Sequence, residues 1–441
     1  MNENKKKNLV ELGKNILIVV LSCTAVYMGA NALVVGGIPG LFQKNDPEST
    51  QVVTQREPSG VAWPVRMVIS GWTGDSMIRY GVQYDRAECD TQFQPVASLL
   101  REALSGLGVA QEVSEQAWRW VLTRSDSLYF DLLGEVPLSV LSGWLSGSEN
   151  AQEGTVRRLI LTAEQKHVFV YYQDTVTEKY YMRVAEVVSV EQIRNVTQAV
   201  MGNGARFAFE AEGFEDLEAN TLLLPEQPSP RIFEVVNPMD GVHQTEQLEQ
   251  HSNLGKLLVA LSFPDSSYIY SGTDQVIRSG NDTLRVSEQG AVRYNAADGE
   301  VSRYTVQTQG EQPTAFEVAE ACRRLADGAA GELAGDARLY LKELRKTGEG
   351  WQVDFAYCLD GARVQVGDEG YAARFVVEGT EITQFVLQLR CYTRTEEQSV
   401  VMPELQAGAA MSAMGRGGSE LLLAYRDNGA GTVSAVWTAN E

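Results

Sequence analysis

The sequence predicts an α+β protein in which an N-terminal transmembrane helix precedes a multi-domain extracytoplasmic body of antiparallel sheets with packed helices. Three observations predict it. The chain has no charged residue between Lys14 and Lys44. Its 441 residues exceed the usual size of one domain, so two or three domains are expected. Beyond the first segment, helical periodicities alternate with short strand-like runs that tight turns connect, which is typical of α+β folds.

The apolar run from Ile16 to Val35 is long enough to cross a hydrocarbon core of about 30 Å at about 1.5 Å per residue. Lys5, Lys6, Lys7 and Lys14 precede it. By the positive-inside rule, the N-terminus stays in the cytoplasm and the body lies outside the cell. We therefore expect a single-pass protein of the cell membrane, which meets the lipid bilayer through this helix.

The charges on the two sides of this segment differ in sign. The lysines before it, together with Glu3 and Glu11, sum to +2; because the whole chain carries −21, the remainder carries −23. Such an acidic body repels nucleic acid and anionic lipid headgroups, so we expect no nucleic-acid partner.

Two alternatives for the first segment stay open. A signal peptide would be cleaved near Ala30-Asn31-Ala32, but the apolar stretch continues through Leu33-Val34-Val35, which favours an uncleaved anchor. A lipoprotein would be modified at Cys23, but Leu21-Ser22 fits the required motif poorly. If the segment spans the membrane, its polar and small residues are suited to a helix–helix contact. The residues that we expect to contact a partner there are Ile16, Val20, Ser22, Thr24, Tyr27 and Asn31.

Changes in composition divide the chain further. A polar stretch with Pro47 and Pro58 reads as a linker that leaves the membrane. The predicted organisation is a cytoplasmic tail (1–14), a transmembrane helix (15–37), a linker (38–64), an N-terminal α+β domain (65–188), a middle α+β domain (189–305) and a C-terminal α+β domain (312–441).

The N-terminal domain begins with helices and ends in strands. Pro95 opens a helix that carries apolar residues at helical spacing as far as Leu107, and Ser114 is suited to cap a second helix. Leu128-Tyr129-Phe130 is typical of a strand, and Pro137 starts a short helix. The expected strands that follow are 156–162 and 168–172, which form a hairpin, and 180–187.

The middle domain combines two helices with short strands. We expect a helix near 191–201, a strand at 231–236 and a helical stretch around 244–261. A three-stranded meander follows at 275–278, 283–286 and 291–294, with turn residues between the strands.

The C-terminal domain begins with a helix whose capping box is Thr314 and Glu317. Strands at 339–344 and 351–359 precede a tight turn at Asp360-Gly361. Two hairpins complete the domain, one from 372–377 and 382–390, the other from 420–425 and 433–437.

No catalytic, metal-binding or cofactor-binding constellation stands out in the sequence, so we expect a protein that is not an enzyme. His167, His243 and His251 are expected to be surface residues. Gly202-Asn203-Gly204 lacks the strand and third glycine of a dinucleotide loop, and it reads as a turn. The carboxylate pairs Glu210 with Glu212 and Glu396 with Glu397 are expected in generally acidic surface.

The cysteines and tyrosines leave alternatives open. Cys358 and Cys391 could form a disulfide outside the cell, but buried thiols are the favoured interpretation of Cys89, Cys322, Cys358 and Cys391. The four tyrosines in the strands of the N-terminal domain should alternate between core and surface. They are Tyr171, Tyr172, Tyr180 and Tyr181.

Several stretches resemble the YycH family. The first runs from Ser127-Leu-Tyr-Phe-Asp131 through Glu135-Val-Pro-Leu138 to Trp144 and Val156-Arg-Arg-Leu-Ile-Leu161. The second combines Thr283-Leu-Arg-Val-Ser287 with Gly290-Ala-Val-Arg-Tyr294. The last domain, with Gly350-Trp-Gln-Val-Asp-Phe355 and Asp360-Gly361, resembles the C-terminal part that YycH shares with its relative YycI.

This resemblance implies a membrane-anchored extracytoplasmic regulator of Firmicutes. It implies binding to the sensor histidine kinase of the WalK/WalR (YycG/YycF) two-component system, which governs the cell wall, with a YycI-like protein as a further partner. It carries over no catalytic residue and no cofactor. The alternatives are a binding or assembly module for cell-wall machinery without kinase coupling, and a divergent cell-wall enzyme.

Overall fold

The computed structural model describes nine stretches of the chain. They are 60–147, 152–240, 252–263, 268–271, 274–297, 299, 301–348, 350–429 and 431–439. They belong to one compact unit, residues 56–441. The predicted tail, transmembrane helix and most of the linker lie outside the described residues. Within the described stretches, no helix combines the length and the apolar character that a membrane span requires.

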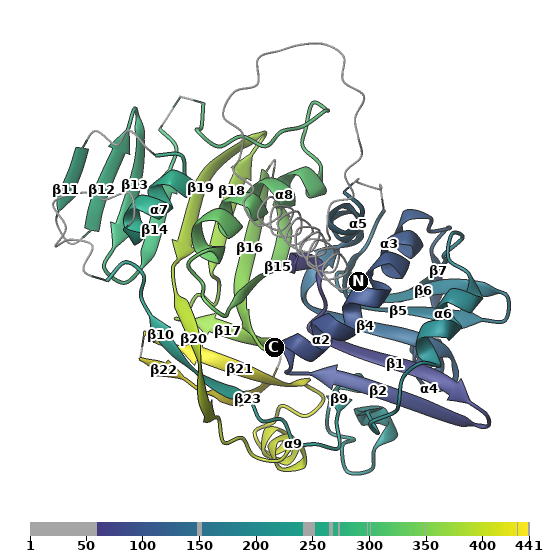
Figure 1. Cartoon of the computed structure of the whole chain (residues 1–441). Coiled ribbons are helices and arrows are strands. Elements are labelled where there is room, and N and C mark those ends of the chain that lie inside the picture. Colours follow the sequence, from purple (N-terminus) through teal and green to yellow (C-terminus); the bar gives the residue numbers. More distant parts are fainter. Residues whose placement is uncertain are drawn as a thin grey trace, which may run out of the picture. The chain divides into compact units, whose positions relative to one another are not determined.

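A seven-stranded antiparallel sheet forms from the first strands of the body (Figure 1). Its strand order is β2-β1-β4-β5-β6-β7-β3. The strands are β1 (Arg66–Thr73), β2 (Ser76–Gln83), β3 (Gln111–Val113), β4 (Asp126–Pro137), β5 (Thr155–Glu164), β6 (His167–Asp174) and β7 (Tyr180–Val184).

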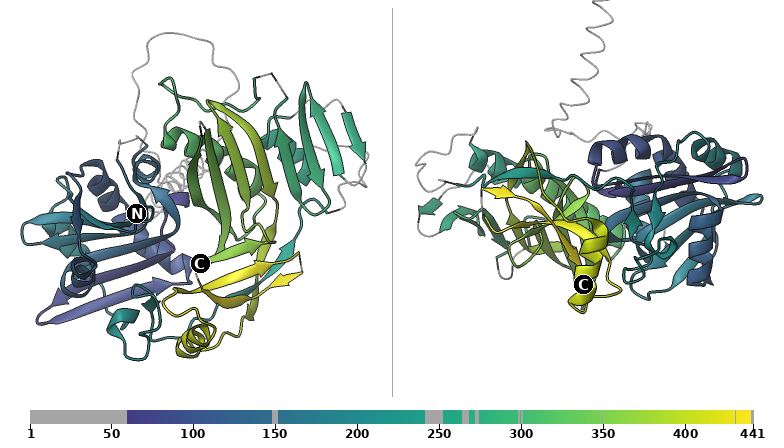
Figure 2. Two further views of the ribbon diagram at one scale, coloured as in Figure 1. Left: turned by 180° about the vertical axis from the view of Figure 1, so that it is seen from behind. Right: turned by 90° about the horizontal axis from the view of Figure 1, so that it is seen from below.

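Helices cover both faces of this first sheet (Figure 2). One face packs against a core that includes Phe93, Leu100 and Phe130. The opposite face packs against Trp118 and Phe207. The helices of this part are α2 (Arg86–Phe93), α3 (Ala97–Ser105), α4 (Glu115–Arg124), α5 (Leu138–Ser146) and α6 (Val190–Thr197), with single turns at η1 (Gly60–Ala62), η2 (Gln94–Val96) and η3 (Ala208–Glu210).

An eleven-stranded sheet forms the second half. Its order is β11-β12-β13-β14-β19-β18-β16-β17-β21-β23, and β15 pairs with β16 beside this path. Only the β17–β21 pair is parallel among the pairs of this sheet in the described chain. The strands are β11 (Tyr268–Ser271), β12 (Asp274–Ser279), β13 (Asp282–Ser287), β14 (Ala291–Asn295), β15 (Arg338–Thr347), β16 (Gly350–Leu359), β17 (Ala362–Val366), β18 (Ala373–Glu378), β19 (Glu381–Gln388), β21 (Leu421–Asp427) and β23 (Ala435–Ala439).

Helix α8 (Ala315–Ala326) packs on this second sheet, where Val318 and Cys322 are fully buried in the same core as Phe355. The other helical elements are α7 (Asn253–Ala260), η5 (Asp327–Gly331) and α9 (Glu404–Ala413). Two small sheets complete the fold. They are β20 (Cys391–Gln398), β10 (Arg231–Val236) and β22 (Thr432–Val433), and the pair β8 (Arg206–Phe207) and β9 (Leu222–Leu223).

The middle and C-terminal segments share strands. β14 pairs with β19, and β10 lies between β20 and β22, so strands from both segments hydrogen-bond within the same sheets. The boundaries at 65–188, 189–305 and 312–441 stay a prediction.

The predicted α+β class with mostly antiparallel sheets is confirmed. Ser114 caps α4, and Thr314 with Glu317 forms the capping box of α8. The predicted hairpins β5–β6 and β18–β19 and the meander β12–β14 are present. Asp360-Gly361 is the tight turn, with positive φ at both residues, 49° and 86°. Of the helical stretch expected at 244–261, the described part is helical as α7.

Candidate functional site

The two large sheets meet where β4 passes β15. We call this contact, together with the side chains beside it that connect the two sheets, the seam. The pairing of β4 with β5 breaks between Asp131 and Val136. Within the break, Leu133 adopts a positive φ of 70°. A Cβ on Gly134 would lie 1.8 Å from the carbonyl oxygen of Leu341 on β15. The bulge and the glycine therefore allow the two backbones to approach.

Five charged side chains connect the sheets across the seam; four are buried and the fifth, Arg157, is 12% exposed. Glu420, just before β21, accepts hydrogen bonds from Arg157 of β5 at 2.6 and 2.9 Å. Arg157 also donates to Asp131 of β4, at 3.1 and 3.0 Å. Arg66 of β1 bridges the two carboxylates, at 2.9 Å to Asp131 and 3.0 Å to Glu420. Arg158 lies 2.7 Å from Glu420. This set of Arg66, Asp131, Arg157, Arg158 and Glu420 is called the ionic cluster.

The ionic cluster keeps its carboxylates charged. Burial alone would raise the pKa of Glu420, but three neighbouring guanidinium groups hold it far below its usual range. Burial likewise opposes ionisation of Asp131, and the same cations lower its pKa. Burial disfavours the charged form of Arg158, but the carboxylates raise its pKa well above the ordinary value. All these groups are therefore ionised near neutral pH, and the cluster is a structural connection between the sheets.

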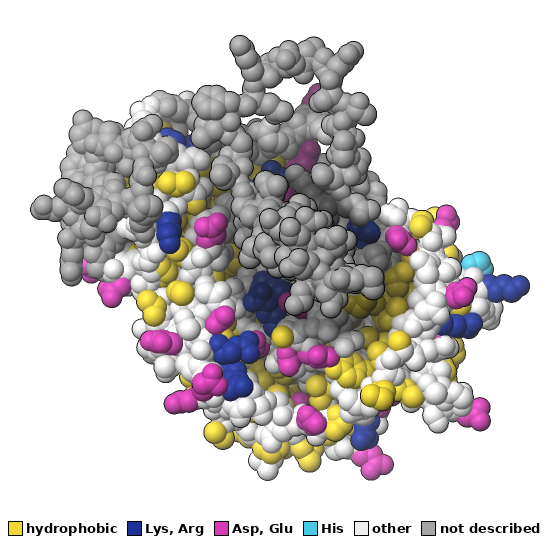
Figure 3. Space-filling view, in the orientation of Figure 1, with side chains coloured by type: hydrophobic (Ala, Val, Ile, Leu, Met, Phe, Trp, Pro, Cys, Tyr) yellow, Lys and Arg dark blue, Asp and Glu magenta, His cyan; other side chains and the backbone are white. Residues whose placement is uncertain are grey.

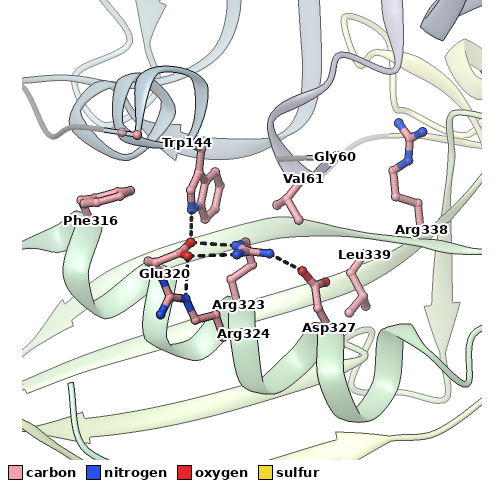
Figure 4. A pocket seen from close by; sticks show the side chains of 12 residues that line it. Gly60, Val61, Trp144, Phe316, Glu320, Arg323, Arg324, Asp327, Arg338 and Leu339 are labelled. Carbon is pink, nitrogen blue, oxygen red and sulfur yellow. Dashed lines mark hydrogen bonds and ion pairs between the residues drawn. The ribbon is translucent and has the colours of Figure 1, made fainter. Parts of the chain in front are cut away.

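A cleft lies between α5 and α8, and Arg338 and Leu339 of β15 also line it (Figure 4). Its volume is about 530 Å³. The indole Nε1 of Trp144 donates to Glu320 at 3.0 Å. Glu320 also accepts from Arg323 and Arg324. Burial would raise the pKa of Glu320, but its hydrogen bonds to these two arginines lower it.

Helices α5 and α8 approach each other closely at the cleft. A Cβ on Gly143 of α5 would lie 2.3 Å from the ring of Phe316 on α8. Only a glycine can face that ring at this distance. The aromatic side chains of Phe316 and Trp144 therefore form one wall of the cleft, and the charged residues of α8 form its floor (Figure 4).

The remaining wall comes from the start of the body. Gly60 and Val61 line the cleft together with Arg338 of β15. Arg338 is held by a bidentate ion pair with Asp90, at 3.1 and 2.6 Å, and lies over the ring of Trp63. In Figure 3, basic side chains gather at the centre of the face shown, with acidic and apolar side chains around them.

Arg324 is the group in the cleft that is best placed to bind a partner. Its side chain is 61% exposed, and it donates to Glu320 through Nε at 2.8 Å. Arginine recognises carboxylates through its two terminal nitrogens. The lining residues, all from the described chain, include no histidine, cysteine or serine nucleophile. The exposed guanidinium of Arg324 suits the cleft to binding a carboxylate of a partner.

The membrane residues predicted to contact a partner lie outside the described residues. They are Ile16, Val20, Ser22, Thr24, Tyr27 and Asn31. Their role stays a prediction. His243 and His251 also lie outside, whereas His167 is exposed at the β5–β6 turn, as predicted. Among the described residues, no group of three or more metal-ligating side chains is placed to hold a metal ion.

Several residues expected at the surface have structural partners. Glu210 does not lie in open acidic surface, because it accepts two hydrogen bonds from Arg79. The tyrosines of the first sheet do not alternate between core and solvent: Tyr171 and Tyr172 are buried, and Tyr180 and Tyr181 are half-buried. Helix α4 covers the second face of this sheet, so that neither face is left to solvent.

The four described cysteines are free thiols, and three of them are buried. Burial raises the pKa of the Cys358 thiol to about 11. The expected buried thiols are therefore found for Cys89, Cys322 and Cys358, and Cys391 is half-buried.

Sequence reasoning did not find the ionic cluster or the α5–α8 cleft. The only local signal was the pair Arg157-Arg158 within an otherwise apolar strand, because a charge in a buried strand requires a partner. Its partners are up to 263 positions away, so no spacing rule could identify them.

Comparison with known proteins identifies a likeness of fold. The crystal structure of YycH from Bacillus subtilis is similar to this chain with a TM-score of 0.51, over 87% of this chain and 96% of that one. Sequence identity is 12%, so the likeness shows the fold alone. No family model matches the sequence, and no curated protein does. The YycH-like architecture predicted from the sequence is therefore supported at the level of the fold.

Proposed function

We propose that this chain is a membrane-anchored extracytoplasmic regulator that binds a sensor histidine kinase and modulates its activity. The observation that carries the proposal is the fold shared with YycH, which extends over 87% of this chain and includes both halves of the body. The YycH resemblance implies the kinase of a cell-wall-controlling two-component system as partner, with a YycI-like protein as a further one.

The charge pattern of the sequence supports the anchored arrangement. Four lysines precede a segment without charge, and the rest of the chain is strongly acidic. Such a pattern favours a cytoplasmic N-terminus and an external body. A regulator of this kind acts by preferring one state of its partner, and it shifts the partner's equilibrium by the difference between its affinities for the two states.

The topology can be tested separately from the function. In intact cells, an external protease should digest the body and leave an epitope at the N-terminus protected. In inside-out vesicles, protection should be reversed. Protection of the body in intact cells would contradict the external location.

The function is tested by cross-linking in the native membrane, followed by purification of the tagged full-length chain. Enrichment of a sensor histidine kinase over an unrelated single-pass control would support the proposal. Enrichment of wall synthases or hydrolases without a kinase would favour the assembly-module alternative. Hydrolysis of peptidoglycan by the purified protein would favour the enzyme alternative.

A matched pair of variants locates the contact. In the first, residues 15–37 are replaced by a poly-leucine span of equal length. In the second, Arg324→Gln changes the exposed cation of the α5–α8 cleft. Loss of the kinase only in the first variant would assign the contact to the membrane helix, and loss only in the second would assign it to the cleft.

A further inference from the structure

A second cavity lies along the seam, on the side of β15 that also carries Lys342. Its volume is about 790 Å³, within the range of about 300–1,000 Å³ typical of small-molecule sites. One wall comes from the first sheet, through residues such as Glu135 and Gln173. The other wall comes from the second sheet, through residues such as Lys342 and Gln365. A ligand in this cavity would therefore contact both sheets.

Two carboxylates occupy one part of the cavity. Glu135 of β4 and Glu343 of β15 both line it. Partial burial raises the pKa of Glu135, and the negative charge of Glu343 raises it further. Glu343 has one cationic neighbour, the half-exposed Arg345 at 3.6 Å. Since like charges disfavour each other's ionised forms, a cation bound between the two glutamates would be stabilised.

Lys342 and Arg426 are two of the cations that line the same cavity. Lys342 donates from Nζ to the carbonyl oxygen of Gly370 at 3.0 Å, which uses one of its three N–H groups. A Cβ on Gly370 would lie 3.6 Å from this Nζ and 3.7 Å from Gln365 Cγ. Gln365 is the direct neighbour of Arg426 in the β17–β21 pair. Lys342 and Arg426 therefore both lie near Gln365.

The guanidinium of Arg426 has hydrogen-bond donors that are available to a ligand. Its side chain is exposed and makes no ion pair or hydrogen bond with any part of the chain that the structure describes. A carboxylate near Gln365 could accept from Lys342 and Arg426 together. By contrast, Arg157 and Arg158 in the floor are already held by the ionic cluster, so they shape the cavity but do not supply its binding capacity.

Side chains of both signs line the cavity, and the cations include Arg363 and Arg416 as well as Lys342 and Arg426. Asp368 and Glu369 also line the cavity, and Glu369 faces Arg374 at 3.7 Å. An inorganic anion would meet these carboxylates as well as the cations. A ligand with both an ammonium and a carboxylate would match the two parts of the cavity.

We propose that this seam cavity binds a short zwitterionic peptide, with its ammonium between Glu135 and Glu343 and its carboxylate between Lys342 and Arg426. This inference goes beyond the proposed function, because it concerns a small ligand and is independent of kinase binding.

The test is calorimetric titration of the full-length protein in detergent with three related probes. The probes are trialanine, N-acetyl-trialanine, which lacks the ammonium, and trialanine amide, which lacks the carboxylate. Trialanine should bind in a saturable 1:1 manner, and each blocked peptide should bind about tenfold more weakly because it loses a charged hydrogen bond. Failure of trialanine to bind, or equal binding of all three, would overturn the proposal.

Variants match each end of the ligand to its side chain. Glu135→Gln should weaken the binding of trialanine about tenfold. It should leave the affinity for N-acetyl-trialanine unchanged, because the acetylated peptide has no ammonium for Glu135 to bind. Arg426→Gln should weaken the binding of trialanine and leave the affinity for trialanine amide unchanged. Both residues are exposed, so the fold should persist, and circular dichroism would check it.

The controls are Glu226→Gln and Arg206→Gln, which change exposed charges that do not line this cavity. They should not alter binding of any probe. The controls could weaken the binding of trialanine as much as Glu135→Gln and Arg426→Gln do. In that case the charge of the whole protein would explain the binding, and the proposed site would be refuted.

Discussion

Glu420 and Arg157 form a bidentate ion pair at 2.6 and 2.9 Å, although 263 positions separate them in the sequence. Arg157 belongs to β5 of the first sheet, and Glu420 directly precedes β21 of the second. Glu420 is buried and the Arg157 side chain is 12% exposed, and their partners Asp131 and Arg66 are buried. The ionic cluster therefore adds a charged connection to the hydrophobic core that the two halves of the body share.

Glu420→Gln should destabilise the protein strongly. The amide keeps the size of the side chain but leaves the guanidinium groups around it with too little negative charge. Removing one partner of a buried ion pair typically costs about 3–5 kcal/mol. The change is measured by denaturant unfolding of the full-length protein in detergent. Glu397→Gln, at an exposed site on β20, is the control and should change the unfolding free energy by less than about 0.5 kcal/mol. Equal effects of the two variants would show that the ionic cluster does not connect the sheets.

Acid should destabilise the protein through the same carboxylates. The pKa values of Asp131 and Glu420 are lowered in the folded state relative to 3.8 and 4.5. Such groups contribute stability that is fully present above the unfolded pKa and is lost as pH falls through the folded one. The unfolding free energy should therefore fall steadily below about pH 5. Glu420→Gln should flatten this slope, and an unchanged slope would contradict the assignment.

Local signals in the sequence were sufficient for many elements. Ser114 and Thr314 cap their helices because each side-chain oxygen accepts a hydrogen bond from the backbone N–H three residues later. This contact is local and does not depend on where the helix packs in the fold. The β5–β6 hairpin and the Asp360-Gly361 turn likewise depend on residues that are close in the sequence. These elements could be predicted from the sequence.

Asn203 illustrates what the sequence could not show. Gly202-Asn203-Gly204 was predicted to be a turn, but its role depends on Gly81, 122 positions earlier. The side chain of Asn203 accepts from Gly81 N–H at 2.9 Å and donates to its carbonyl oxygen at 2.7 Å. It thereby satisfies the backbone N–H and C=O of Gly81 on the edge strand β2, as a neighbouring strand would. The candidate sites are built in the same way, from residues that only the tertiary fold brings together.

Glu404 should make the stability sensitive to pH near neutrality. Burial raises its pKa to about 7 at the first residue of α9. Because the folded pKa lies above the unfolded value of 4.5, folded protein binds more protons between these pH values, and stability falls as pH rises through this window. The N-terminus of a helix favours a negative charge by about 0.3–1 kcal/mol, so we expect a net loss of about 2 kcal/mol. Glu404→Gln should abolish the loss in denaturant unfolding at pH 5 and pH 8, and a loss that persisted in this variant would have another source.

Gly143→Ala should disrupt the α5–α8 cleft. The added Cβ would lie 2.3 Å from the ring of Phe316, so the ring or the helix must move. Overpacking of this kind typically costs about 1–3 kcal/mol. Gly328→Ala is the matched control, because nothing lies within 4 Å of its Cβ, and it should be neutral or slightly stabilising.

The second variant in this test removes the ring. Phe316→Ala alone leaves a gap and should also destabilise, but in combination with Gly143→Ala the added methyl group enters the space that the ring leaves. The double variant should therefore be more stable than the sum of the two single changes predicts, by about 1 kcal/mol or more in denaturant unfolding. Simple additivity would mean that Gly143 and Phe316 do not contact each other, and the wall of the cleft would then have to be assigned to other residues.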